Sequence, residues 1–145
     1  MMIAQILKSK GSQVVSVHPG DCIASITRTL AQHRIGAVLV MEADGTVLGI
    51  VSERDIVRAL AGMGEAVMRM TAGQLMTRVL FTASPASTIP DALQLMTDRR
   101  VRHLPVLHAD GKLAGMVSIG DLVKARIAEA EQETEALKTY VATAG

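Results

Sequence analysis

The sequence contains few of the residues on which several common functions depend. Its 145 residues include one cysteine, Cys22, two aromatic residues, Phe81 and Tyr140, and no tryptophan. A single cysteine cannot form an intramolecular disulfide or a cysteine-rich zinc site, and we interpret Cys22 as a small apolar helix residue rather than a reactive thiol. This cysteine usage predicts a cytoplasmic location. Two aromatic side chains provide no stacking platform for single-stranded bases.

The chain also lacks a dominant charge and a long apolar run. There are 15 Lys and Arg residues against 14 Asp and Glu residues, and a net charge of +1 argues against nucleic acid as the partner. The longest apolar run, Ala37 to Met41, is far shorter than the roughly 20 residues that cross a bilayer. The first ten residues lack the pattern of a secretory signal. We therefore expect no membrane span and no export, and the 49% of hydrophobic residues suffices to bury a core.

An internal repeat organises the chain. When the sequence is shifted by 66 residues, 11 of the 26 positions from Arg34 to Ala59 meet the same residue type in Arg100 to Ala125. Such a match at a fixed offset indicates two copies of one structural unit. The repeated residues of the first copy are Arg34, Val40, Ala43, Asp44, Gly45, Gly49, Val51, Ser52, Asp55, Val57 and Ala59.

The repeat also sets the expected domain boundaries. Residues 5–7 match residues 74–76 at an offset of 69, so the first copy carries three extra residues near Gly11. Glycines flank the join between the copies, which is typical of a connection. We expect a first repeat over residues 1–62, a linker over 63–72, a second repeat over 73–128 and a C-terminal helical tail over 129–145.

Hydrophobic periodicity predicts a strand, a helix, a buried hairpin and a second helix in each copy. In the first copy these elements lie at residues 14–17, at 23–30 behind a cap at Asp21, at 37–41 with 47–51, and from Ser52. In the second copy they lie at residues 80–83, at 89–96, at 104–107 with 113–117, and from Ser118. The expected fold class is therefore α/β, twice βαββα, with a C-terminal helical extension.

The most specific repeated feature is a Gly-x-Val-Ser-x-x-Asp string at the end of each hairpin. It spans Gly49 to Asp55 in the first copy and Gly115 to Asp121 in the second. A serine followed three residues later by a carboxylate is typical of a capping box. The same geometry suits a nucleotide, because helix N-terminal amides favour phosphate and a carboxylate accepts hydrogen bonds from two ribose hydroxyls. Both interpretations stay open from the string alone.

A basic cluster precedes the middle strand of the second copy. It comprises Arg99, Arg100, Arg102 and His103. Like charges at this density repel one another and need water or an anion. The first copy has Gly36 and Ala37 opposite Arg102 and His103, so the shared fold does not require the cluster. We interpret the cluster as an anion site, and the small residues of the first copy as room for a planar base.

Tandem βαββα units with these strings, and with Arg-His-Leu-Pro-Val at residues 102–106, resemble a pair of cystathionine-β-synthase (CBS) domains, also called a Bateman module. The resemblance covers about residues 4–126. It implies a stand-alone, bacterial-type, non-catalytic sensor that binds AMP, ADP, ATP or NAD(H) in clefts between the copies. It also implies that two modules associate into a disc and that occupancy regulates an unidentified protein partner.

The resemblance further implies a role for individual residues. Asp55 and Asp121 would hold the riboses. The phosphate contacts would come from Ser52, Arg54, Ser118, Arg102 and His103. The adenine contacts would come from Val15, Ile35, Gly36 and Ala37 in the Asp121 cleft, and from Phe81, Thr82 and Val101 in the Asp55 cleft. Arg54 is matched by Gly120, so we do not expect the two sites to be equivalent.

Catalytic and metal sites find no support in the sequence. The four histidines lack metal-ligand spacing, and there is no Gly-x-Ser-x-Gly elbow and no phosphate-binding Gly-Lys-Ser/Thr string. We therefore expect no enzyme activity, no catalytic cofactor and no metal. The competing interpretation is a structural dimerisation module in which the Ser-x-x-Asp strings only cap helices.

The C-terminal segment carries an amphipathic stripe at alternating steps of four and three residues. The stripe comprises Val123, Ile127, Ala130, Thr134, Leu137 and Val141. It needs cover from its own domain or from a second subunit. We predict a homodimer, because this stripe and the hairpin layers offer more apolar surface than a chain of this size covers alone.

Overall fold

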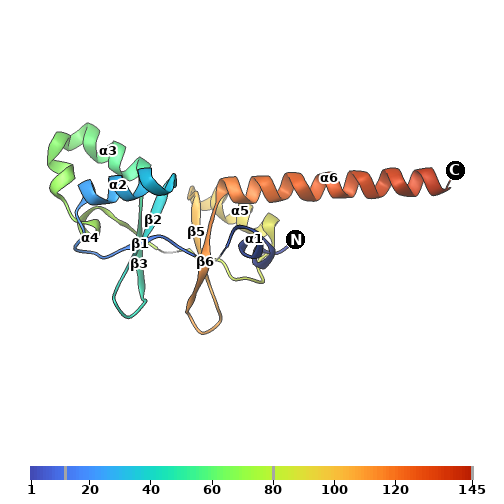
Figure 1. Cartoon of the computed structure of the whole chain (residues 1–145), viewed down its shortest axis with the longest axis horizontal. Helices are drawn as coiled ribbons and strands as arrows, with labels where there is room; N and C mark the ends of the chain where they lie inside the picture. Colours follow the sequence, from blue (N-terminus) through green and yellow to red (C-terminus); the bar gives the residue numbers. More distant parts are fainter. Residues whose placement is uncertain (12, 80, 145) are drawn as a thin grey trace. The chain divides into compact units, whose positions relative to one another are not determined.

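The computed structural model describes residues 1–11, 13–79 and 81–144. The chain forms two compact units (Figure 1). Unit 1 comprises Met1–Ser12, Ala83–Ala109 and Ala114–Gly145, and unit 2 comprises Gln13–Thr82 and Asp110–Leu113. Each unit thus combines the N-terminal segment of one sequence copy with the hairpin of the other copy.

Unit 2 contains a four-stranded sheet in the order β1-β2-β3-β4. Strand β1 (Ser16–Val17) pairs in parallel with β2 (Ala37–Met41), whereas β3 (Val47–Ser52) pairs antiparallel with both β2 and β4 (Thr77–Arg78). The residues of β2 from Ala37 to Val40 are all buried, as expected of a continuous apolar run with neighbours on both faces. Gly45, at φ +91°, makes the turn of the β2–β3 hairpin.

The described residues of unit 2 also form four helical segments. They are α2 (Ile23–His33), α3 (Glu53–Met63), the 3-10 helix η1 (Gly64–Arg69) and α4 (Ala72–Leu75). Helix α2 buries Ile23, Ile26 and Leu30 against strand residues such as Val38, which confirms its periodicity. The expected linker is an ordered part of the unit, since η1 buries Val67 completely.

Two expectations about the start of α2 are wrong. The N-cap is Cys22, which is exposed and lies outside the helix, and its side chain makes no capping hydrogen bond. Asp21 does not cap the helix, because its carboxylate accepts a hydrogen bond from the His18 N–H at 2.9 Å and so closes the preceding turn. Cys22 instead forms an antiparallel bridge with Thr71.

Unit 1 contains the helices α1 (Ile3–Lys10), α5 (Ile89–Arg99) and α6 (Ile119–Ala144) and a two-stranded sheet of β5 (His103–Leu107) and β6 (Leu113–Ser118). The strand expected at residues 80–83 is reduced to a parallel bridge between Ala83 and Val106, and Leu80 lies outside the described residues. Just upstream of this segment, Thr77–Arg78 forms β4 and pairs with β3 in unit 2.

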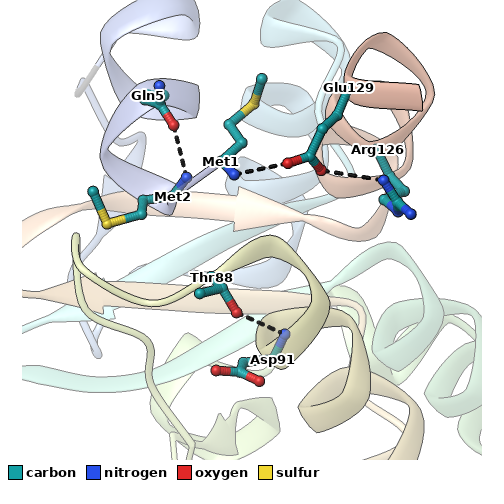
Figure 2. Close-up of polar contacts among 7 residues, drawn as sticks. All are labelled: Met1, Met2, Gln5, Thr88, Asp91, Arg126 and Glu129. Atoms are coloured by element: carbon teal, nitrogen blue, oxygen red, sulfur yellow. Dashed lines mark hydrogen bonds and ion pairs between the residues drawn. The ribbon is translucent and has the colours of Figure 1, made fainter. Parts of the chain in front are cut away.

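Polar contacts near α1, α5 and α6 of unit 1 are drawn in Figure 2. The Met1 ammonium contacts Glu129 at 2.8 Å, and Glu129 also accepts a hydrogen bond from Arg126 at 3.3 Å. The Asp91 N–H donates to the Thr88 hydroxyl at 3.2 Å, so Thr88 caps α5. The first contact ties the start of the chain to α6 within this unit.

The glycine of each Gly-x-Val-Ser-x-x-Asp string lies where another segment approaches the hairpin closely. A Cβ atom on Gly49 would lie 2.6 Å from the Thr77 carbonyl oxygen and 2.8 Å from Met76 Sδ, and one on Gly115 would lie 2.7 Å from Leu7 Cδ2. Met76 and Leu7 are equivalent positions of the repeat, at an offset of 69. The two glycines therefore accommodate the same packing in both units.

The longest helix is α6, with 26 residues. Within the described ranges, α6 and the other helices are not both long and apolar enough to span a membrane.

Candidate functional site

In unit 1, the second Ser-x-x-Asp string forms a reciprocal cap at the start of α6. The Ser118 N–H donates to Asp121 Oδ2 at 2.8 Å, and the Asp121 N–H donates to Ser118 Oγ at 3.2 Å. The predicted capping geometry is therefore present. Both residues are half-buried, and the cap orients a carboxylate at the positive end of a long helix.

A lysine from α1 also contacts this carboxylate. Lys10 Nζ donates to Asp121 Oδ2 at 2.7 Å and to the Met116 carbonyl oxygen at 3.1 Å. Burial acts to raise the pKa of Asp121, but the hydrogen bonds and charge of Lys10, together with those from Ser118, outweigh burial and lower the pKa. Asp121 is thus held as a carboxylate.

One residue of the basic cluster, Arg102, lies next to the start of α6. The Arg102 carbonyl oxygen accepts a hydrogen bond from the Ile119 N–H at 2.8 Å, so the chain at Arg102 adjoins the first turn of the helix. The Arg102 side chain is exposed, and His103, at the start of β5, is half-buried. The structure thus brings the backbone of Arg102 next to the first turn of α6, where Lys10 and the Ser118 N–H contact the Asp121 carboxylate.

In unit 2, the first string forms the equivalent cap at the start of α3. Asp55 Oδ2 accepts from the N–H and from the hydroxyl of Ser52, each at 2.9 Å, and the Asp55 N–H donates to Ser52 Oγ at 3.2 Å. The Glu53 N–H donates to the Gly36 carbonyl oxygen at 2.9 Å, which matches the contact between Ile119 and Arg102. Asp55 Oδ1 also contacts the Thr77 hydroxyl at 3.5 Å. The repeat therefore preserves the residues and the geometry of the Ser-x-x-Asp cap in both units.

The remaining predicted residues differ in exposure. Arg54, in the first turn of α3, is exposed, and so is Thr82, whereas Ala37 is only 1% exposed. The half-buried residues are Val15, Ile35, Gly36, Phe81 and Val101. Val101 belongs to unit 1 and the other adenine residues belong to unit 2. Their assignment to particular clefts stays a prediction.

A groove of about 370 Å³ lies between α2 and α3 in unit 2. It is lined by Thr27, Leu30, Ala31, Arg34, Ile35, Glu53, Ile56 and Val57. Ile35 is the one predicted adenine residue in this lining, and Ser52 and Asp55 do not belong to it. The groove is therefore distinct from the carboxylate sites. Among the described residues, no group of three or more His, Cys, Asp or Glu side chains could hold a metal ion.

Sequence reasoning missed Lys10 as a site residue. Its equivalent at an offset of 69 is Val79, so the repeat does not mark it. The sequence does contain one signal for Lys10, which is a difference between the two copies. Three positions after the matched Leu7, the first copy has a charged residue where the second copy has an apolar one.

The duplicated strand, helix, hairpin and capped helix place the chain among tandem βαββα proteins. Comparison with known families identifies the family. The family model of the CBS domain matches residues 6–62 and 72–128. The chain belongs to the CBS domain family and contains two CBS domains, which confirms the predicted fold class and family.

Three relatives illustrate the similarity. The mitochondrial CBS domain-containing protein CBSX3 of Arabidopsis thaliana is 33% identical over 96% of this chain and 71% of its own length. The crystal structure of a CBS-domain containing protein from Agrobacterium tumefaciens is 44% identical, with a TM-score of 0.83 over 87% of this chain and 99% of that chain. A CBS domain protein from Pyrobaculum aerophilum, complexed with AMP, is 25% identical, with a TM-score of 0.74 over 83% of this chain and 89% of that chain.

Proposed function

We propose that the protein is a non-catalytic regulatory module that binds an adenosine-containing ligand and couples its occupancy to a protein partner or to the oligomeric state. The observation that carries this proposal is the duplicated carboxylate, Asp55 and Asp121, at the first turn of a capped helix in each unit. A relative of the same family is complexed with AMP. The expected ligands are AMP, ADP, ATP or NAD(H), and the expected location is cytoplasmic.

We assign each part of the ligand, ribose, phosphate and adenine, to residues of matching chemistry. Each carboxylate accepts hydrogen bonds from the two hydroxyls of a ribose. We assign the phosphate to the positive ends of the helices at Ser52 and Ser118 and to the cations of Arg54, Arg102 and His103, because the helix dipole and cationic side chains both favour oxyanions. The adenine base packs against the aliphatic and small side chains, since the chain has almost no aromatic residues on which a base could stack.

A ligand panel tests the proposal directly. We expect at least one of AMP, ADP, ATP, NAD, NADH and S-adenosylmethionine to stabilise the protein by about 2.7 kcal/mol when present at about 100 times its dissociation constant, because a ligand that binds the folded state shifts the unfolding equilibrium by mass action. Thermal unfolding identifies the ligand, and calorimetry measures its affinity and stoichiometry. Guanosine and cytidine monophosphates are the matched controls for phosphate binding without adenine.

The competing function is a structural dimerisation module without a physiological nucleotide. The observation in its favour is that both Ser-x-x-Asp strings form complete caps, so each has a structural role in the absence of ligand. The panel separates the two functions. An absence of stabilisation by every adenosine ligand would support the structural module.

The homodimer is part of the proposal, and α6 carries the argument for it. The stripe residues Leu137 and Val141 are 63% and 61% exposed. The heptad that fits the stripe places Ile127 at core position a and Leu137 at core position d. The flanking g positions are then Arg126 and Glu133, and the flanking e positions are Glu131 and Lys138. In a parallel pair of helices each g residue faces the e residue five positions further along the partner helix, and both pairs then join opposite charges. We infer that two copies of α6 associate in parallel.

Leu137→Glu is expected to raise the dimer dissociation constant by at least about tenfold, since a charge replaces a leucine at a core position of each helix. Light scattering over a micromolar concentration range measures the mass. Ala136→Glu is the matched control, because it adds the same charge one residue away and off the stripe. A monomeric wild-type protein over this range would contradict the dimer, and equal effects of both variants would contradict the contact through the stripe.

A further inference from the structure

The carboxylate of Asp121 is already engaged by a cation from a distant part of the sequence. Lys10 Nζ lies 2.7 Å from Asp121 Oδ2, and the Ser118 N–H lies 2.8 Å from the same oxygen. A carboxylate oxygen offers about two acceptor positions, so both positions of Oδ2 are filled. A ribose that uses both oxygens of Asp121 must therefore displace one of these donors.

The donor that can leave is Lys10. The Ser118 N–H is fixed by the backbone of the helix cap, whereas Lys10 ends in a flexible four-carbon chain. The Lys10 side chain is 40% exposed and that of Asp121 is 26% exposed, so water can solvate the ammonium when the pair opens. An ion pair at this level of exposure contributes little to stability, and a ligand can break it.

At the other site, the repeat places Val79 at the position equivalent to Lys10. Asp55 Oδ2 accepts from the neutral Ser52 hydroxyl, which can turn away, and Asp55 Oδ1 has a long 3.5 Å contact to the Thr77 hydroxyl. Hydrogen bonds from an ammonium are about twice as strong as those from a neutral group. Lys10 therefore distinguishes the two carboxylates, although the caps around them are alike.

The consequence depends on the charge of the ligand. A neutral nucleoside that displaces Lys10 separates an ion pair and supplies no new anion. A phosphorylated nucleoside supplies an anion for the displaced ammonium, in a region where Arg102 is already exposed. We propose that Lys10 is a specificity-determining residue that makes the Asp121 site favour phosphorylated adenosine ligands over adenosine. This proposal rests on the proposed adenosine-binding function.

The test compares AMP with adenosine in an Asp55→Asn background, which isolates the Asp121 site. Lys10→Met removes the ammonium and keeps a strong helix former. We expect Lys10→Met to tighten adenosine binding about threefold, because no ion pair has to be opened, and to weaken AMP binding about tenfold, because the phosphate loses a charged donor. Calorimetry should therefore show that the preference for AMP over adenosine, the ratio of their association constants, falls about thirtyfold.

Lys8→Met is the matched control, since it removes the same charge from an exposed position of the same helix, and it should leave the ratio unchanged. An unchanged ratio in Lys10→Met, or equal weakening of AMP and adenosine, would overturn the role of Lys10 while leaving the adenosine-binding function intact. If the Lys10-containing protein of the Asp55→Asn background bound neither ligand, the adenosine function of Asp121 would fail, and the specificity proposal with it.

Discussion

Gly49→Ala is expected to lower the free energy of unfolding by about 1 to 3 kcal/mol, the cost of overpacking a close contact. In the interior of a strand, alanine normally stabilises relative to glycine by about 0.5 to 1 kcal/mol. Here the new Cβ atom would meet the Thr77 carbonyl oxygen at 2.6 Å. That oxygen belongs to a strand that pairs with β3 through Gly49 and Ile50, so it cannot retreat without loosening the pairing.

Two further glycines make the measurement specific. Gly115→Ala meets the flexible end of Leu7 at 2.7 Å, and Gly62→Ala meets nothing within 4 Å. Urea unfolding should therefore give the largest loss for Gly49→Ala, a smaller loss for Gly115→Ala, and a gain of about 0.5 to 1 kcal/mol for Gly62→Ala in helix α3. Equal unfolding midpoints for Gly49→Ala and the wild-type protein would show that β4 does not constrain the hairpin.

The repeat made much of this fold predictable, because identical residues at a fixed offset must serve the same structural needs. Arg34 and Arg100 illustrate the point. Each lies in the left-handed region, at φ 53° and 54°, and ends a helix before the hairpin. Asp44 is another repeated residue, and its carboxylate accepts the Thr46 N–H at 2.9 Å just as Asp110 accepts the Lys112 N–H. Local patterns of this kind act within a few residues and can be read from the chain.

What could not be predicted depends on contacts between distant segments. The pairing of Thr77–Arg78 with β3 was not expected, because periodicity carries no information about the partner of a strand. Asp21 failed as a cap because a competing turn at His18 uses its carboxylate. Lys10 reaches Asp121 across 111 residues, and its departure from Val79 in the repeat marks the residue without identifying its partner.

Asp121→Asn is expected to weaken the binding of AMP by about 1.5 to 3 kcal/mol, or roughly tenfold to 150-fold, because a charge-assisted acceptor for the ribose hydroxyls is lost while the side-chain shape is kept. Calorimetry with AMP measures the loss. The ligand-free protein should lose less than about 1 kcal/mol, since the pair with Lys10 is partly exposed and asparagine can still accept a hydrogen bond at the cap.

The control is Asp91→Asn. Asp91 lies in the first turn of α5 and donates its N–H to Thr88, the N-cap residue, at 3.2 Å (Figure 2). It therefore shares with Asp121 the charge, the first-turn position and the capping context, but it lies outside the proposed site. A carboxylate that only supports its helix should behave alike at both positions, with a loss of stability and no loss of affinity. If Asp121→Asn lowered stability without lowering the affinity for AMP, the role of Asp121 would be helix capping alone. The structural dimerisation module would then be the better explanation of the Ser-x-x-Asp strings.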